Sequence, residues 1–237
     1  MPDMPWSEAY EAIEPYVVRI ATPSGSGTGF LVSRTKGNLI AIATAAHVVD
    51  HAHYWEQPIR IEHFATAKSV LLRQADRAIF LEEDRDTAAL VFNIGELDLP
   101  STPPVLGPEG RFLKVGCELA WVGFPAVASV NLCFFSGRVS AHRPDEHTYL
   151  VDGVAINGVS GGPAFWNGGN RLSVTGVVSA YIPNRASGIV LPGLSIIRDV
   201  SQFHDITKRF KSLDKARSEQ STPQEPPPPA ESINPLK

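Results

Sequence analysis

The sequence predicts an all-β protein built from antiparallel sheets. Its 237 residues contain many short apolar segments of strand length, and Gly, Pro, Asn or Asp stands in nearly every gap between them. Strands do not alternate with helical patterns, which argues against a parallel sheet. Hydrophobic residues make up 43% and charged residues 19% of the chain, so there is ample material for a buried core.

The predicted strands form two groups that a proline-rich connector separates. The connector spans residues 98–104, has three prolines in seven residues and offers little to bury. The first group lies before it, at residues 16–20, 29–32, 39–43 and 88–92. The second group lies after it, at residues 118–122, 130–135, 149–151, 174–178 and 188–191. Short strands punctuated in this way are typical of antiparallel sandwiches and barrels.

Helices are expected only near the two ends of the chain. Residues 7–14 predict a short helix that Ser7 caps and Pro15 ends, and residues 199–217 predict a closing helix. Residues 218–237 are rich in Pro, Ser, Glu and Gln, so we expect them to be disordered. The run Pro226–Pro229 could dock on a partner's aromatic groove, although a bare tail is the simpler interpretation.

Charge and composition exclude several classes of partner. The formal net charge is −4 and no basic face is concentrated, so nucleic acid is not expected as a partner. The longest apolar stretch, residues 112–135, is broken by charged residues and a proline, so no membrane association is expected. Two cysteines, Cys117 and Cys133, supply no disulfide framework, and the N-terminus lacks the pattern of a signal peptide. We therefore expect a cytoplasmic protein.

The strongest local motif is the segment Asn157-Gly158-Val159-Ser160-Gly161-Gly162-Pro163. A nucleophilic serine needs its Oγ exposed on a tight turn, with backbone N–H groups directed at the oxyanion that forms on attack. Glycines on both sides of Ser160 allow the sharp backbone conformations that such a turn requires. A plain glycine-rich turn would carry the same residues, so the motif needs support from elsewhere in the chain.

A histidine and an aspartate supply that support. His47 follows small residues at the end of the predicted strand 39–43, where an imidazole held with little freedom can act as a general base. The six other histidines are expected to be structural or solvent-facing. Asp86 opens the apolar strand 88–92, so it can be half buried and still hold the tautomer of an imidazole. Taken alone, Asp86 would fit an acidic loop equally well.

The order and context of these residues resemble those of the chymotrypsin-like serine peptidases, and among them the bacterial Deg/HtrA-type subgroup. The order is His47, Asp86, Ser160, with separations of 39 and 74 residues. The first two residues fall in the first strand group and Ser160 falls in the second. The matching stretches are residues 25–32, 44–49, 86–90 and 158–163.

The resemblance implies two antiparallel six-stranded β-barrels with the active site in the cleft between them. It divides the chain into an N-terminal helix (1–15), a first barrel (16–105), a second barrel (106–198), a C-terminal helix (199–217) and a disordered tail (218–237). It also implies a serine endopeptidase that acts through an acyl-enzyme on a protein or peptide substrate. The amides of Gly158 and Ser160 would form the oxyanion hole, and Ser179 would support Asp86 and line the primary pocket.

The chain also departs from the secreted members of that family. Val154, Ala155 and Ile156 stand where trypsin-like members carry an acid that binds Arg or Lys. With Ser179 and Ala180 they predict an apolar primary pocket that prefers small or medium residues before the cut. No new N-terminus that cleavage would release is evident, and the usual disulfides and a following peptide-binding module are missing.

Three alternatives remain to be weighed. The serine motif also fits the nucleophile elbow of α/β-hydrolases, but that fold needs its acid and histidine after the serine, where only Asp199, His204 and Asp205 are found. A catalytically silent barrel that binds a peptide is the stronger alternative, and it leaves room for an activating protein partner. No cofactor or metal is expected: His47 and His51 are four residues apart, but no H-E-x-x-H motif accompanies them.

Overall fold

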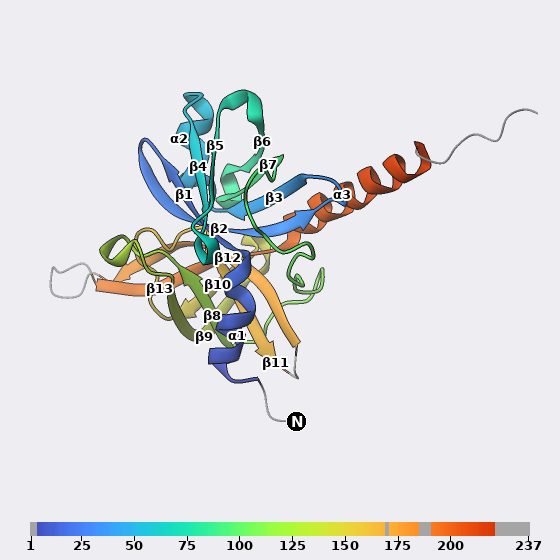
Figure 1. Cartoon of the computed structure of the whole chain (residues 1–237). Helices are drawn as coiled ribbons and strands as arrows, with labels where there is room; N and C mark the ends of the chain where they lie inside the picture. The colour runs from blue at the N-terminus through green and yellow to red at the C-terminus, as the bar shows by residue number, and fades with distance from the viewer. Residues whose placement is uncertain (1–3, 169–170, 185–190, 221–237) are drawn as a thin grey trace, which may run out of the picture.

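A computed structural model describes residues 4–168, 171–184 and 191–220 of the chain. Figure 1 shows two β units packed one above the other, with a long C-terminal helix projecting from their junction. Their strands pair antiparallel throughout the described residues, apart from an isolated parallel bridge between Leu106 and Val174. The predicted double-barrel fold class is therefore confirmed, and the parallel sheet of an α/β-hydrolase is excluded.

The first unit is a seven-stranded sheet. Its strand order is β5-β4-β1-β2-β3-β7-β6. The strands are β1 (Val17–Thr22), β2 (Gly25–Arg34), β3 (Leu39–Thr44), β4 (Ile59–His63), β5 (Ser69–Leu72), β6 (Arg77–Glu82) and β7 (Thr87–Asn93). The sequence patterns had predicted β1, β2, β3 and β7 only. Strand β4 alternates apolar and polar residues, whereas β5 and β6 hold short apolar runs, Val70–Leu72 and Ala78–Leu81, that had not been predicted as strands.

The first unit is a half-barrel, whereas six strands in a closed barrel had been predicted. Its two edge strands, β5 and β6, follow each other in the chain without pairing. The side chain of Arg77 bridges the gap, because its guanidinium donates to the carbonyls of Leu72, Ala52 and Gln57 at 2.8, 3.1 and 2.7 Å. A side chain thus replaces the backbone ladder that would have closed the sheet.

The second unit is a closed barrel of six strands, in the order β10-β13-β12-β11-β8-β9. The strands are β8 (Glu118–Gly123), β9 (Cys133–Arg143), β10 (Thr148–Asp152), β11 (Pro163–Gly168), β12 (Arg171–Asn184) and β13 (Leu191–Asp199). The strand predicted at 130–135 begins only at Cys133. Residues 188–190 of the last predicted strand lie outside the described residues, and β11 had not been predicted.

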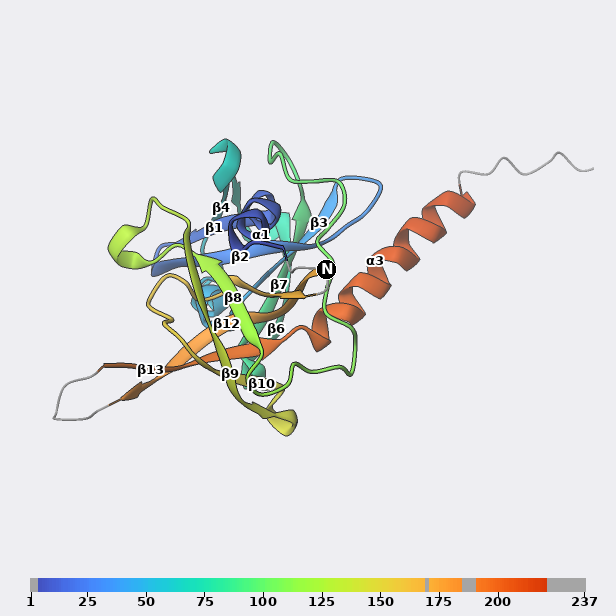
Figure 2. The same cartoon turned by 90° about the horizontal axis from the view of Figure 1, so that it is seen from below.

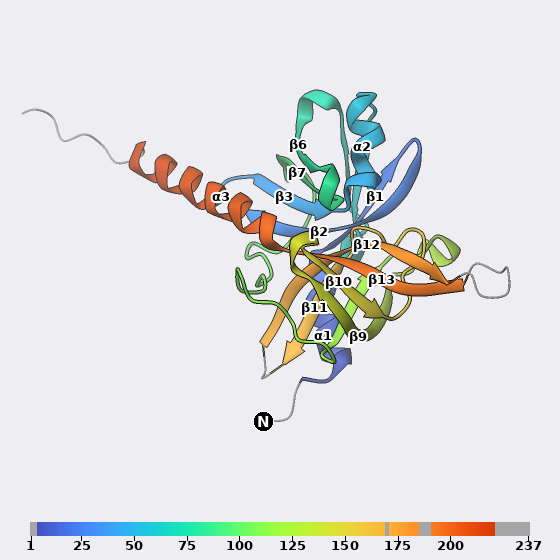
Figure 3. The ribbon, with the colours of Figure 1, turned by 180° about the vertical axis from the view of Figure 1, so that it is seen from behind.

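Three α-helices accompany the sheets in the described chain: α1 (Trp6–Ile13), α2 (Ala46–Tyr54) and α3 (Ser201–Gln220). Helix α1 has Pro5 rather than Ser7 at its N-cap position, and it packs beside the second barrel (Figure 1). Seen from below, helix α3 projects away from both units (Figure 2). Helix α3 and the β12–β13 hairpin extend on opposite sides of the molecule (Figure 3). None of these helices is long and apolar enough to span a bilayer. Helix α3 begins at Ser201 and continues to Gln220, so residues 218–220 are helical although they had been predicted to belong to the disordered tail. The rest of that tail, from residue 221, lies outside the described residues.

Each β unit has its own core, and a third cluster joins them. Ile20, Leu31 and Leu90 lie fully buried inside the first sheet, and Trp121 and Val178 lie inside the second barrel. A further cluster contains residues of both units and of helices α1 and α3, namely Ala9, Ile13, Phe30, Phe165, Phe203 and Phe210. Burial of apolar surface at about 25 cal/mol per Å² therefore stabilises the junction as well as the two units.

Candidate active site

The register between β3 and β7 brings His47 and Asp86 together. Thr44, at the end of β3, pairs with Ala88, near the start of β7. The chain continues from Thr44 into α2, where His47 occupies the first turn, and Asp86 directly precedes β7. A strand end had been predicted for His47, but the segment after Ala45 forms a helix, which fixes the imidazole more firmly than a loop would.

Hydrogen bonds from two donors of His47 hold the pair. The backbone N–H of His47 donates to Asp86 Oδ1 at 3.0 Å, and His47 Nδ1 lies 2.9 Å from both carboxylate oxygens. Asp86 takes a left-handed backbone conformation with φ of 47°, which turns its side chain toward the helix. The imidazole is about half exposed, at 48%, whereas the carboxylate is only 20% exposed. His47 Nε2 therefore remains available on the solvent side.

The environment shifts the pKa values of both groups in the direction that an acid–base pair needs. The hydrogen bond to Asp86 raises the pKa of His47, against the opposing effect of burial. Burial would raise the pKa of Asp86, but the hydrogen bonds from His47 and Ser179 outweigh it and lower that pKa. Asp86 is therefore ionised near neutral pH and stabilises a positive charge on His47.

Ser179 joins the pair from the second barrel. It lies on β12, and its Oγ donates to Asp86 Oδ2 at 2.5 Å. Ser179 is only 2% exposed. The hydrogen bond therefore lies in a buried position, and it joins the second barrel to the first unit. The contact with Asp86 that the family resemblance implied for Ser179 is present in the structure.

Ser160 lies on a tight turn between β10 and β11. Gly158 and Gly161 flank it with φ of 92° and 86°, values that L side chains rarely adopt. A Cβ atom on Gly158 would lie 2.2 Å from the carbonyl oxygen of Phe124, and one on Gly161 would lie 2.0 Å from that of Thr28. Only glycine fits at either position, and Val159 between them is fully buried.

Two backbone amides on this turn are unpaired. Within the part of the chain that the structure describes, neither Gly158 N nor Ser160 N donates to any protein acceptor. The neighbouring amides are used: Val159 N donates to Ile156 O, and Gly161 N donates to Val178 O. The two free donors are those that the family resemblance implied for an oxyanion hole.

Thr28, on β2, ties this turn to the first unit. Its backbone N–H donates to Ser160 O at 2.8 Å, and its Oγ1 donates to Gly158 O at 2.9 Å. The same Oγ1 accepts from Phe124 N at 3.0 Å, and the Thr28 carbonyl accepts from Thr44 Oγ1 at 2.7 Å. The predictions had used Thr28 only as part of a matching stretch. A threonine inside a glycine-rich apolar strand, fully buried in the fold, was the available sign of this role.

The hydroxyl of Ser160 does not bond to His47. Its Oγ donates instead to the carbonyl of Ser179 at 3.2 Å. Ser160 and His47 nevertheless line the same pocket.

That pocket has a volume of about 290 Å³ and lies between the two units. Its lining residues are His47, Ala155, Ile156, Asn157, Ser160, Val178, Ser179, Ala180 and Tyr181. Val154, predicted as a pocket residue, is absent from this lining. Its carbonyl accepts from Trp121 Nε1 and its side chain is 43% exposed, because the chain turns the residue outward there. Asn157 and Tyr181 line the pocket and had not been predicted.

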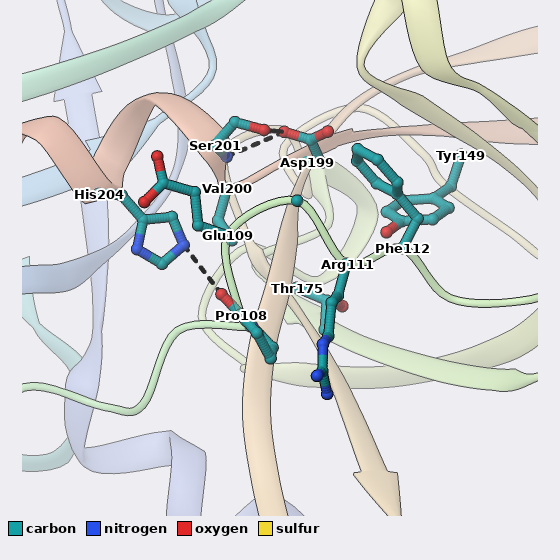
Figure 4. A pocket seen from close by; sticks show the side chains of 12 residues that line it. Pro108, Glu109, Arg111, Phe112, Tyr149, Thr175, Asp199, Val200, Ser201 and His204 are labelled. Atoms are coloured by element: carbon teal, nitrogen blue, oxygen red, sulfur yellow. Dashed lines mark hydrogen bonds between the residues drawn. The ribbon is translucent and has the colours of Figure 1, made fainter.

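A second cavity at the start of α3 is unsuited to a substrate. Its volume of about 20 Å³ has room for one water molecule. His204 bonds to the carbonyl of Gly107, and Asp199 accepts from the backbone N–H of Ser201 (Figure 4). The hydrogen bonds of His204 and Asp199 thus hold the start of α3 in place. Neither residue lines the pocket that contains Ser160. Among the described residues, no group of three His, Cys, Asp or Glu side chains could hold a metal ion.

The arrangement of these residues defines the class of the protein. A half-barrel and a closed barrel meet at a cleft that carries His47 and Asp86 on one side and Ser160 on the other, as in chymotrypsin-like serine peptidases of the Deg/HtrA type. The chain belongs to the trypsin-like peptidase family: residues 27–177 match its peptidase domain.

Solved structures with the same fold include Deg5, with a TM-score of 0.62 and 20% identity over 84% of this chain and 90% of that one. The serine endoprotease from Yersinia pestis gives 0.64 and 16% identity, covering 89% and 67%. The inactive Ser343Ala form of Rv3671c from M. tuberculosis H37Rv gives 0.57 and 18%, covering 95% and 98%. A search of curated protein sequences finds no significant match. At these identities the likeness concerns the fold.

Proposed function

We propose that the protein is a serine endopeptidase in which His47, Asp86 and Ser160 form the catalytic triad. The observation that carries the proposal is the pair of unpaired amides, Gly158 N and Ser160 N, beside a serine that shares a pocket with a carboxylate-held imidazole. Donors that are fixed before the reaction stabilise a developing oxyanion, and this is usually the largest single contribution to such catalysis.

The geometry fits an acyl-enzyme mechanism. Rotation of the Ser160 side chain brings Oγ to His47 Nε2, which removes its proton as Oγ attacks the substrate carbonyl. The resulting oxyanion accepts from Gly158 N and Ser160 N, and ionised Asp86 stabilises the imidazolium. His47 then gives the proton to the leaving amine, and water that His47 activates releases the acyl group from Ser160.

The pocket supports a preference for small or medium apolar residues before the cut. Ala155, Ile156, Val178 and Ala180 supply apolar walls, and no acid among the residues that the structure describes lines the pocket to pair with Arg or Lys. A digest of a peptide library, with Ser160→Ala as the control, tests this preference. Cuts mainly after Arg or Lys would contradict it.

A catalytically silent or partner-activated binding module is the second candidate. It is favoured by one observation, the hydrogen bond of Ser160 Oγ to Ser179 O, which leaves the hydroxyl unpaired with its base. In that case a protein partner organises the turn at Ser160, and the cleft binds a peptide without cutting it until the partner is present.

A fluorophosphonate probe separates the two candidates. Labelling of the wild type but not of Ser160→Ala supports the peptidase, and His47→Ala should then label far more slowly because the base is lost. Complete absence of labelling, in a protein whose circular dichroism shows an intact fold, would favour the binding module. Labelling that appears only after a protein partner is added would favour partner activation.

We also propose that the protein acts in a reducing compartment such as the cytoplasm. Cys117 and Cys133 are both free thiols, and the fold uses no disulfide between them. The expected result is that a reducing agent leaves the midpoint of thermal unfolding unchanged. A fall in that midpoint would point to intermolecular disulfides and an oxidising compartment.

A further inference from the structure

An open apolar groove lies between α3 and the first sheet. Its walls are Leu39, Phe80 and Val91 on the strands β3, β6 and β7, and Ile206, Phe210 and Leu213 on the helix. The volume is about 550 Å³, and the lining is almost wholly apolar. Figures 1 and 3 show α3 running past β3 on its way out from the junction of the two units.

Large apolar side chains on both walls of this groove are only half covered. Phe80 is 46% exposed on the strand side, and Leu213 is 45% exposed on the helix side. Single apolar residues on a surface need no explanation, but two that face one groove form a patch that a further segment can cover. Phe80 is also aromatic, and proline-rich segments dock in grooves that aromatic side chains line.

A cation stands at the rim of the groove. The Arg209 guanidinium lies 5.9 Å from the centre of the Phe80 ring. No carboxylate in the described residues forms an ion pair with Arg209, whereas the adjacent Lys208 pairs with Glu109 and Asp205. A ligand that combines proline rings with a carboxylate would therefore match both the groove and its rim.

The chain itself supplies such a segment directly after α3. Residues 221–237 follow the helix, and they contain Pro226–Pro229 with Glu225 before and Glu231 after the run. We propose that residues 223–231 fold back along α3 and place the proline run in this groove, with Glu231 beside Arg209. Consecutive prolines adopt the extended polyproline helix, which is ordered before it binds and so loses little entropy on docking.

The lengths agree with this placement. Leu213 lies seven residues before the end of α3 at Gln220, and Arg209 lies eleven residues before it, which is roughly 10 Å and 17 Å at 1.5 Å per residue. A reversal at residues 221–223 returns the chain toward the groove. At about 3.1 Å per residue, Pro226 and Pro229 then lie roughly 9 and 19 Å back along the helix, so the proline run spans the interval from Leu213 to Arg209. Glu231 lies roughly 25 Å back, about 8 Å beyond the Arg209 backbone, a separation that the two long side chains can cover.

Attachment to α3 favours this occupant over one from another molecule. A segment that a few residues connect to its site has an effective concentration in the millimolar range, so even weak contacts suffice for docking. A second copy of the chain, or a partner's proline-rich segment, would have to compete with it. This interaction does not depend on the proposed peptidase activity.

The test uses the full chain in a Ser160→Ala background, so that no variant can cut the added peptide. Replacing Pro226–Pro229 by serine empties the groove, and a fluorescent peptide of residues 221–237 is then titrated in while its anisotropy is followed. We expect saturable binding to this variant and binding at least about tenfold weaker to the chain with its own prolines, because that groove is already filled.

Leu213→Glu added to the serine-substituted chain should abolish binding, and Val127→Glu, at an 88% exposed site outside the groove, should not. Glu231→Lys in the peptide should weaken binding severalfold. Circular dichroism verifies that each variant is folded. The proposal is overturned if the peptide does not bind the emptied groove, or if Leu213→Glu leaves binding unchanged. A dimer in sedimentation that Leu213→Glu dissociates would assign the groove to a second copy instead.

Discussion

The two sides of the cleft are built differently. On the side of the first sheet, His47 lies on a helix and Asp86 directly precedes a strand, and the backbone N–H and Nδ1 of His47 both bond to the Asp86 carboxylate. On the side of the second barrel, Ser160 sits on a turn between strands, and two glycines of positive φ shape that turn. The His47–Asp86 pair is thus fixed within one unit, whereas Ser160, the proposed nucleophile, depends on contacts from the other.

Those contacts come mainly from Thr28. Its backbone and hydroxyl bond to Ser160 O and Gly158 O across the interface, and Ser179 bonds back to Asp86 from the second barrel. The geometry of the site is therefore a property of the packing between the units. A substitution that loosens the interface should impair the nucleophile and the oxyanion hole before it impairs the His47–Asp86 pair.

The largest effect is expected for the pair itself. Asp86→Asn should lower kcat by about 10⁴-fold with the fold intact, because an amide no longer holds the correct tautomer or stabilises the imidazolium. The pKa of His47, which the bond to Asp86 raises, should fall in this variant. Since neutral His47 is the base, activity of the wild type is lost as the pH drops through its raised pKa.

The acid limb of the kcat/KM profile should consequently move to lower pH in Asp86→Asn. Profiles of residual activity for the two proteins measure this shift. An unchanged limb would show that another group controls ionisation of His47.

A large effect on stability is expected at the serine turn. Gly161→Ala places a Cβ 2.0 Å from Thr28 O at a φ of 86°, so it should destabilise the protein by about 3 kcal/mol. Gly25→Ala is the matched control, because nothing lies within 4 Å of the added methyl group on the same strand as Thr28. Urea denaturation monitors both, and equal stabilities would refute the steric account.

Much of this site could be predicted from the sequence, and the reason is local. Ser160 lies between glycines that are typical of a tight turn around a nucleophilic serine. His47 follows alanines that are typical of a histidine held at the end of a strand. Asp86 could be placed only through its order in the chain, because an acid before an apolar strand is common. The helix after Ala45 was missed, since it has only nine residues and follows an alanine that supplies no capping side chain.

The parts that could not be predicted depend on contacts between distant residues. Where the half-barrel is open, Arg77 bridges the carbonyls of Leu72, Ala52 and Gln57, and no local pattern encodes such a bridge. Val154 was expected in the pocket from its spacing to Ser160, yet the backbone turns it toward solvent. Tyr181 lines the pocket because β12 continues past Ser179 along the cleft.

An intermediate effect is expected for the link between the units. Thr28→Val keeps the shape of the side chain but leaves Gly158 O and Phe124 N without their partner, which costs about 1–3 kcal/mol for each buried group. We expect the rate of fluorophosphonate labelling to fall about 10- to 100-fold. Thr28→Ser keeps the hydroxyl and should restore most of it. Loss of stability without loss of labelling would make Thr28 purely structural.

The smallest effect is expected for Ser179→Ala, and its sign depends on pH. The hydrogen bond from Ser179 helps to lower the pKa of Asp86, so it stabilises the folded state above the ordinary carboxyl pKa of about 3.9 and is lost as the pH falls through the lower folded value. Ser179→Ala should therefore cost about 1–2 kcal/mol at pH 7 and less at pH 3, as measured by urea denaturation. Ser140→Ala, at an exposed position on β9, should show no such dependence. An equal cost at both pH values would mean that Ser179 acts by packing, and the interface would then depend on Thr28 for its polar contacts with the serine turn.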